Sequence, residues 1–213
     1  MKTKFQNFYS LAKNESVNFE KQLFIMNKLI FTFCLLSFSC FLSAQTGNKL
    51  PDLDKSSMDM SYYPANYPIL KIQNKTTEPP VARVVYSRPL RQGRKVFGEL
   101  VEYGKLWRLG ANEATEIEFF KDVRISGKKI QKGRYTLYAL VNENNWTLII
   151  NKDTDVWGAF KYESKKDVLR IELPVEKTAE TIEAFSIVFE KSNNIINLVI
   201  AWENVRVSLP IIK

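Results

Sequence analysis

The stretch that decides the fold is residues 132–150, KGRYTLYALVNENNWTLII. After the turn residues Lys132 and Gly133, apolar side chains stand at every second position from Tyr135 to Val141, and a second alternating run begins at Trp146. A period of two is typical of a β-strand with one buried face. Only residues 142–145 separate the two runs, and so short a connection joins antiparallel neighbours. The stretch therefore predicts a β-hairpin.

Further runs of the same kind extend along the chain. They occupy residues 81–86, 115–119, 169–173, 185–189, 196–202 and 205–211. Short connections, among them residues 191–194 and Glu203-Asn204, again favour antiparallel hairpins, and Ser126-Gly127 marks one more small hairpin. The one helical candidate is residues 178–183. Eight or nine antiparallel strands with little helix predict an all-β domain, either a β-sandwich or a jelly-roll-like barrel.

The N-terminal part of the chain has the features of an export signal. Lys28 precedes an apolar run over residues 29–42, which ends at Ser43-Ala44. A positive start, an apolar run of this length and a small exit residue are typical of a secretory signal peptide, because a membrane span needs about 20 apolar residues. We predict a signal peptide over residues 26–44 and a periplasmic or extracellular protein. Residues 1–25 are then expected to precede the true start at Met26, and a lipid anchor at Cys40 is the less favoured alternative.

The rest of the chain has room for one domain. Residues 45–80 contain five prolines and show neither a helical nor a strand period, so we predict a linker or arm there. The β domain is then expected to span residues 81–213, a common size for a single domain. We predict no membrane span after residue 44, and the oligomeric state stays open.

Composition excludes several kinds of chemistry. The chain has no histidine, and its two cysteines, Cys34 and Cys40, lie inside the predicted signal peptide. Disulfides, cysteine nucleophiles, histidine bases and metal sites built from thiolates or imidazoles are therefore not expected, and we predict no cofactor. Beyond residue 44 there are 26 Lys and Arg against 21 Asp and Glu. So small an excess on an exported protein does not favour nucleic acid as a partner.

The segment of residues 87–114 is the main candidate for function. It separates two predicted strands by 28 residues, and connections of that length are often functional. It combines arginines with aromatic residues, which suits the recognition of carboxylate, phosphate or sugar groups. The alternative is structural, with Trp107 plugging the end of the sandwich and Arg108 bridging Glu113 or Glu116. The candidate ligand-binding residues are Arg88, Arg94, Trp107, Arg108, Asn112, Glu113 and Trp157.

A second aromatic loop, residues 151–166, holds Trp157, Phe160 and Tyr162. If it lies beside residues 87–114, the two loops would form an aromatic cleft for a glycan or a flat ligand; the alternative is a hydrophobic lid over the core. The loop also carries Asn151, Asp153 and Asp155 at the spacing that begins a calcium loop. That pattern then fails, because Val156 replaces the required glycine and Tyr162 the bidentate glutamate. We predict a structural turn and no metal.

Three functions are compatible with these residues. The leading hypothesis is a non-enzymatic domain that binds a small molecule or a glycan-like ligand through residues 87–114. The first alternative is a hydrolase without histidine or cysteine, in which Glu113 acts with a second carboxylate such as Glu116, Glu118 or Asp155. Glu116 and Glu118 share one strand face, which is expected to be the solvent face. The second alternative is a structural or protein-interaction module of the cell envelope.

Several short motifs together resemble one bacterial family. They are Ser87-Arg88-Pro89, the run from Gly93 to Gly98, the run from Tyr103 to Arg108, the run from Gly110 to Thr115, and Trp157-Gly158-Ala159. The chain is similar to the domain-of-unknown-function family numbered 2911, found largely in exported proteins, over about residues 81–211. The resemblance implies that the shared residues are Trp107, Arg108, Gly110, Ala111, Asn112, Glu113 and Thr115. It implies no reaction, and Leu109 departs from the polar residue expected at its position.

Overall fold

The computed structural model describes Met26, Lys28 and residues 50–213. The chain divides into two compact units, Met1–Asp52 and Leu53–Lys213. Apart from Met26 and Lys28, the predicted extension over residues 1–25 and the predicted signal peptide over residues 26–44 lie outside the described residues. The fold and the sites below belong to the second unit.

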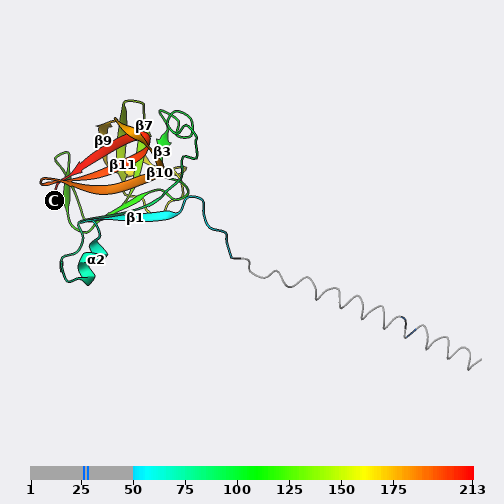
Figure 1. Ribbon diagram of the computed structural model, residues 1–213, viewed down its shortest axis with the longest axis horizontal. Helices are drawn as coiled ribbons and strands as arrows, with labels where there is room; N and C mark the ends of the chain where they lie inside the picture. The colour runs from blue at the N-terminus through cyan, green and yellow to red at the C-terminus, as the bar shows by residue number, and fades with distance from the viewer. Residues whose placement is uncertain (1–25, 27, 29–49) are drawn as a thin grey trace, which may run out of the picture. The chain divides into compact units, whose positions relative to one another are not determined.

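The second unit is built on a seven-stranded antiparallel sheet (Figure 1). Six of its strands follow one another across the sheet in the order β1, β2, β4, β7, β8 and β9, and the short strand β3 pairs with β7. The predicted hairpin is its centre, with Leu137 opposite Ile150. The bounds are β1 Met58–Tyr63, β2 Ala82–Ser87, β3 Leu106–Trp107, β4 Glu116–Phe119, β7 Gly133–Val141, β8 Asn145–Asn151 and β9 Asp167–Pro174.

A long hairpin forms the second layer. Its strands, β10 Glu176–Ser192 and β11 Ile195–Ile211, pair with each other over most of their length and lie side by side in Figure 1. Apolar side chains of both layers, such as Leu148 on β8 and Leu198 on β11, meet in one buried core. The remaining elements are α2 Tyr67–Ile72, β5 Val123–Ile125, β6 Lys128–Ile130 and the 3-10 turn η1 Ser164–Lys166.

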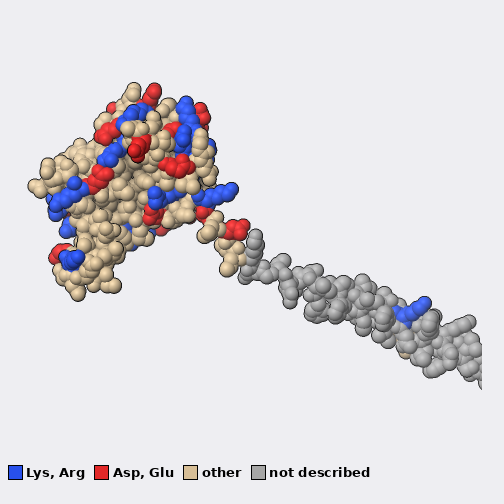
Figure 2. Space-filling view, in the orientation of Figure 1, with Lys and Arg blue, Asp and Glu red and all other residues tan. Residues whose placement is uncertain are grey.

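The predicted all-β antiparallel sandwich is confirmed, and the jelly-roll-like barrel is not, because the sheet ends at β1 and β9 without closing. The small predicted hairpin is also confirmed as β5 and β6. Figure 2 shows basic and acidic side chains mixed over the visible face of this unit, so that face has no extended basic surface.

Two predictions about the long hairpin were wrong. Glu203-Asn204 was expected to be a turn, but β11 continues through it. Apolar residues occupy even positions up to Trp202 and odd positions from Val205, and Glu203 has φ 56°. The pairing register of β10 and β11 shifts twice here, between Lys177 and Ile182 and between Ile182 and Ser186, so the change of phase marks a bulge in the hairpin and not a turn. The bulge is shared by residues 178–183, which were expected to be helical and instead belong to β10.

The segment expected to be a linker or arm, residues 45–80, contains β1 and α2. Sequence alternation does not reveal β1, because Met58 and Met60 point to solvent with 51% and 50% of their surface exposed. Pairing with β2 from end to end defines the strand instead. An edge strand can form through backbone hydrogen bonds to one neighbour without an apolar face of its own.

Candidate functional site

Residues 87–114 do not form a free loop. Their first part is fixed to β10, where the Arg91 amide donates to the Glu183 carbonyl at 2.8 Å and the Phe185 amide donates to the Pro89 carbonyl at 3.0 Å. Their middle part contributes β3 to the sheet. The segment is therefore held against both layers, and only parts of it reach the surface.

Trp107 belongs to the aromatic core. Its exposed fraction is 7%, and its indole Nε1 donates to the Gly110 carbonyl at 3.2 Å. The ring stacks on Trp202 with 6.1 Å between ring centres and meets Trp146 edge to face. These contacts agree with the structural alternative for Trp107, and only part of the residue borders a cavity.

Arg88 is also structural. Its guanidinium pairs with Asp59 on β1 at 3.0 Å and donates to the Phe185 carbonyl and the Ser186 hydroxyl, both at 3.1 Å. Its donors are directed at protein acceptors on β1 and β10, so the side chain joins the two layers. The structure assigns it a tie between elements rather than ligand contact.

The turn after Arg108 is closely packed. A Cβ on Gly110, which has φ 142°, would lie 2.7 Å from the Ser87 hydroxyl oxygen. That hydroxyl donates to the Ala111 carbonyl at 2.5 Å and accepts from the Ala111 amide at 2.6 Å. Leu109 is fully buried with φ 56°, which explains why an apolar residue suits this position.

Arg108 borders a cavity of about 210 Å³, which we call the Arg108 hollow. Its lining includes Pro89, Arg94, Leu100, Val101, Trp107 and Trp202. The Arg108 Nε is buried without an acceptor, and within residues 50–213 its guanidinium makes no ion pair. Burial lowers the pKa of this side chain. The bridge from Arg108 to Glu113 or Glu116, which the structural alternative expected, is therefore not formed: Glu116 pairs with Arg134, and Glu113 has no side-chain partner within residues 50–213.

Arg94 stands at the same hollow with an exposed side chain. Its guanidinium donates to the carbonyls of Arg91, at 2.9 Å, and Leu90. These neutral acceptors hold the side chain without cancelling its charge. The hollow therefore combines two guanidinium groups with aromatic and aliphatic walls.

The two candidate loops lie side by side. The Gly158 amide donates to the Asn112 carbonyl at 2.9 Å, the Ala114 amide donates to the Val156 carbonyl at 3.0 Å, and Glu113 and Trp157 form an antiparallel bridge. Asn112 has φ 58°, and its side-chain amide donates to Asp54 at 2.8 Å. The two loops therefore lie side by side, as a shared site requires. Asn112 links them, because it contacts Gly158 through its carbonyl and Asp54 through its side chain.

The second loop divides into a buried part and an exposed part. Val156, Ala159 and Tyr162 pack on a small apolar cluster with Tyr138 and Ile149. This cluster is separate from the main core, so the loop covers it and not the core as the lid alternative expected. Trp157 and Phe160 do not pack there, because their exposed fractions are 62% and 81%. Their rings stack on each other with 5.8 Å between centres and 14° between planes.

A second hollow, of about 160 Å³, lies between the loops and the sheet edge; we call it the Glu113 hollow. Glu113, Glu116 and Asp155 line it. Arg134 pairs with both Glu116 and Asp155, and the Asp155 amide donates to Glu116 at 2.6 Å. Glu113 is exposed and has no side-chain partner within residues 50–213.

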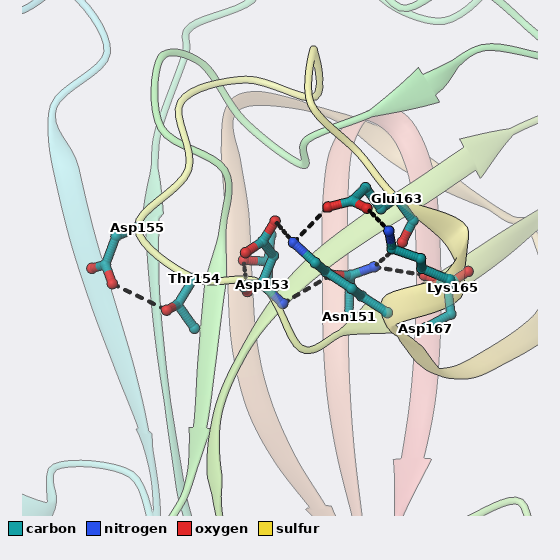
Figure 3. Close-up of polar contacts among 9 residues, drawn as sticks. Asn151, Asp153, Thr154, Asp155, Glu163, Lys165 and Asp167 are labelled. Carbon is teal, nitrogen blue, oxygen red and sulfur yellow. Dashed lines mark hydrogen bonds and ion pairs between the residues drawn. The ribbon is translucent and has the colours of Figure 1, made fainter.

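The loop with the calcium-like spacing contains a turn in which Asp153 and Glu163 pair with Lys166; we call it the lysine-centred turn (Figure 3). The Lys166 ammonium lies 3.0 Å from Asp153 and 2.7 Å from Glu163, whereas Asp155 lies apart from them in the figure and pairs with Arg134. Hydrogen bonds from Lys165 and Lys166 lower the pKa of Glu163 to about 2. The two aspartates therefore serve different cationic side chains.

Nearby, Tyr162 donates to Asp167 at 2.6 Å, and its pKa is raised to about 12 by burial and by that carboxylate. Buried Asn151 donates to Asp167 at 2.8 Å and to the Glu163 carbonyl at 3.1 Å. These hydrogen bonds join the start of the loop over residues 151–166 to its end. The loop is therefore a structural turn, as predicted.

Sequence reasoning missed two residues that organise these regions. Arg134 connects β7 to Glu116 and Asp155, and Asp59 anchors Arg88 from β1. Asp59 was overlooked because its segment showed no strand period. The alternation within residues 132–150 could have placed Arg134 on the solvent face, although it could not identify its partners.

Comparison with known proteins gives one match. The family model described as "Protein of unknown function (DUF2911)" matches residues 69–211. Searches of curated proteins and of solved structures found no match. In the part of the chain that the structure describes, no helix is long and apolar enough to cross a membrane. The family match covers more than half of the chain, including strands β2 to β11 and most residues that line the two hollows, and the chain therefore belongs to the DUF2911 family of proteins of unknown function.

Proposed function

We propose that this protein is an exported binding domain that takes a small or glycan-like ligand with a carboxylate or phosphate group in the Arg108 hollow. The observation that carries the proposal is the Arg108 side chain, which lines the hollow and whose guanidinium has no acceptor within residues 50–213. The export signal predicted over residues 26–44 would place this domain in the envelope or outside the cell.

An unpaired guanidinium at a partly buried position is costly. Removing a charge from water costs several kcal/mol unless an opposite charge or hydrogen-bond acceptors compensate. A carboxylate or phosphate supplies both, through two parallel hydrogen bonds that match the planar fork of arginine. An anionic ligand would therefore recover the desolvation cost that the protein alone leaves uncompensated.

The size and walls of the hollow limit what the ligand can be. A volume of about 210 Å³ is below the 300–1,000 Å³ of pockets for drug-sized ligands and above the roughly 30 Å³ occupied by one water. One sugar ring or a compact acid is the appropriate scale. The walls from Trp107, Trp202 and Leu100 suit the apolar part of such a ligand, and Arg94 adds a second positive charge.

Calorimetric titration of the domain with D-glucuronate, D-glucose and inorganic phosphate tests this proposal. We expect glucuronate or phosphate to bind through Arg108 and neutral glucose to show no binding that depends on Arg108, because a charged hydrogen-bonded pair contributes about 1.5–3 kcal/mol. Arg108→Ala should weaken binding by at least about tenfold, the equivalent of about 1.4 kcal/mol. Arg108→Lys should restore binding only in part, because lysine cannot form the bidentate pair.

The matched control is Arg206→Ala on β11, where the guanidinium already pairs with Glu190 at 2.7 Å. This variant should bind like the wild type. If neither glucuronate nor phosphate binds, or if Arg108→Ala binds them as tightly as the wild type, the proposal fails.

The two alternatives have less support. A hydrolase needs a second carboxylate to act with Glu113, but Glu116 and Asp155 are both engaged by Arg134. Glu118 pairs with Arg83 at 2.6 Å on the neighbouring strand. A purely structural envelope module would not explain Arg108, because its unpaired charge costs desolvation energy and no contact within residues 50–213 compensates for it.

A further inference from the structure

We propose that Trp157, Phe160 and Glu113 form a second binding site, separate from the Arg108 hollow, for the pyranose rings of neutral glycans. The two aromatic rings would take the apolar face of a sugar, and the Glu113 carboxylate would accept hydrogen bonds from its hydroxyls. This site goes beyond the binding of an anionic ligand and does not depend on Arg108.

The exposed rings are the first observation. Of the four tryptophans, Trp107, Trp146 and Trp202 are exposed by 7%, 1% and 1%, whereas Trp157 is exposed by 62%. Phe160 is exposed by 81%. The rings stack on each other with nearly parallel planes, and most of the surface of this aromatic pair is exposed. Neither ring belongs to the buried apolar clusters of this unit, and a contiguous exposed apolar patch is often a binding site.

The loop holds these rings in a fixed arrangement. Gly158 stands between them in the chain with φ 72°, and a Cβ there would lie 2.6 Å from the Phe160 ring. Backbone bonds from Gly158 to Asn112 and from Ala114 to Val156 fasten the loop to its neighbour. The lysine-centred turn fastens its other end. A ligand would therefore meet a preorganised surface, which lowers the entropy lost on binding.

Glu113 supplies the polar part of the site. It forms an antiparallel bridge with Trp157, and side chains of directly opposite residues lie on the same face with Cβ atoms about 5 Å apart. Glu113 has no side-chain partner within residues 50–213. An aromatic face beside a free carboxylate matches a sugar, whose C–H groups lie on one face and whose hydroxyls lie at the edge. The Glu113 hollow gives room for a ring substituent.

Charge distinguishes this ligand from others that exposed aromatic residues could contact. Glu113, Glu116 and Asp155 outnumber Arg134 around the hollow, so the surface repels acidic sugars. The same carboxylates disfavour insertion into a membrane interface, where anionic headgroups attract basic rather than acidic surfaces. A neutral glycan fits both the rings and the charge.

The test is retention on native affinity gels containing neutral soluble polysaccharides, namely hydroxyethylcellulose, xyloglucan and glucomannan, with polygalacturonate as the acidic comparison. We expect retention on at least one neutral gel and none on polygalacturonate. Trp157→Ala and Phe160→Ala should each weaken the retention at least fivefold, and Glu113→Gln should weaken it less. The matched control is Ile72→Ala on α2, because Ile72 is also exposed by 81%; its retention should equal that of the wild type.

Fluorescence provides a readout specific to the site. Trp157 is the exposed tryptophan, so a bound glycan should protect the wild type from acrylamide quenching and should have no such effect on Trp157→Phe. Arg108→Ala should keep full retention and protection, which separates this site from the Arg108 hollow. The proposal is overturned if no neutral gel retains the protein, if Trp157→Ala and Phe160→Ala are retained like the wild type, or if Trp157 is protected by phosphatidylcholine–phosphatidylglycerol vesicles and not by glycans.

Discussion

The two hollows, lined by the first and the last residues of the Arg108 to Ala114 turn, differ in charge and in burial. The Arg108 hollow is walled by core rings and carries two guanidinium groups. The Glu113 hollow is lined by carboxylates and lies beside exposed rings. One short turn thus separates a basic site built into the core from an acidic site built on the surface. From this difference we expect substitutions in the Arg108 hollow to change both stability and binding. Substitutions beside the Glu113 hollow should change binding with little effect on stability.

The sharpest way to test this contrast is to remove one tryptophan from each site. Trp107→Ala should lower the free energy of unfolding by about 3–5 kcal/mol, because it leaves a large cavity among Trp146, Trp202 and Phe185. Trp157→Ala should change it by less than about 0.5 kcal/mol, as is usual for surface positions. Chemical denaturation followed by circular dichroism measures both values. Equal losses in the two variants would contradict the division into core and surface sites.

A smaller effect of opposite sign is expected at Arg108. Arg108→Met keeps most of the side-chain volume and removes a charge that has no acceptor within residues 50–213, so it should raise the free energy of unfolding by about 1 kcal/mol. Arg88→Met should lower it by about 1–2 kcal/mol, because Arg88 pairs with Asp59 and bonds to β10. Denaturation midpoints of the two variants provide the comparison. A destabilised Arg108→Met would mean that Arg108 has a structural role.

The smallest effect concerns the turn that carries the exposed rings. The pKa of Glu163 is lowered to about 2 in the folded protein by hydrogen bonds from Lys165 and Lys166, whereas an unperturbed glutamate has a pKa of about 4.3. Its stabilising effect should be present above pH 4.3 and disappear as the pH falls towards 2. The melting temperatures of wild type and Glu163→Gln should therefore differ slightly at pH 6 and converge near pH 2. Glu102→Gln, outside this turn, is the control and should show no such convergence.

Much of the fold was predictable from local patterns. The alternation within residues 132–150 identified the central hairpin, and the other periodic runs identified the sandwich, because a side-chain period of two depends only on strand geometry. Where a strand lacked that pattern, the prediction failed. β1 exposes its methionines, and the bulge in β10 and β11 changes the phase of alternation in the way a turn would.

The candidate site was predicted less completely. The sequence directed attention to the correct two loops, but it grouped Trp107, Arg88 and Trp157 as equivalent ligand contacts. The structure separates them into a core ring, a tie between layers and an exposed ring. Residue type alone does not determine exposure at irregular positions, because the partners that cover or pair a side chain come from distant parts of the chain.

By itself, the amino-acid sequence determined the absence of histidine, the confinement of both cysteines to the first 44 residues and the antiparallel character of the central strands. Composition needs no fold, and strand alternation is a local property. Tertiary structure alone decided that Arg108 has no partner within residues 50–213 and that Glu113 lies opposite Trp157. Both facts depend on long-range packing, which brings together segments more than 40 residues apart and leaves one charge without an acceptor.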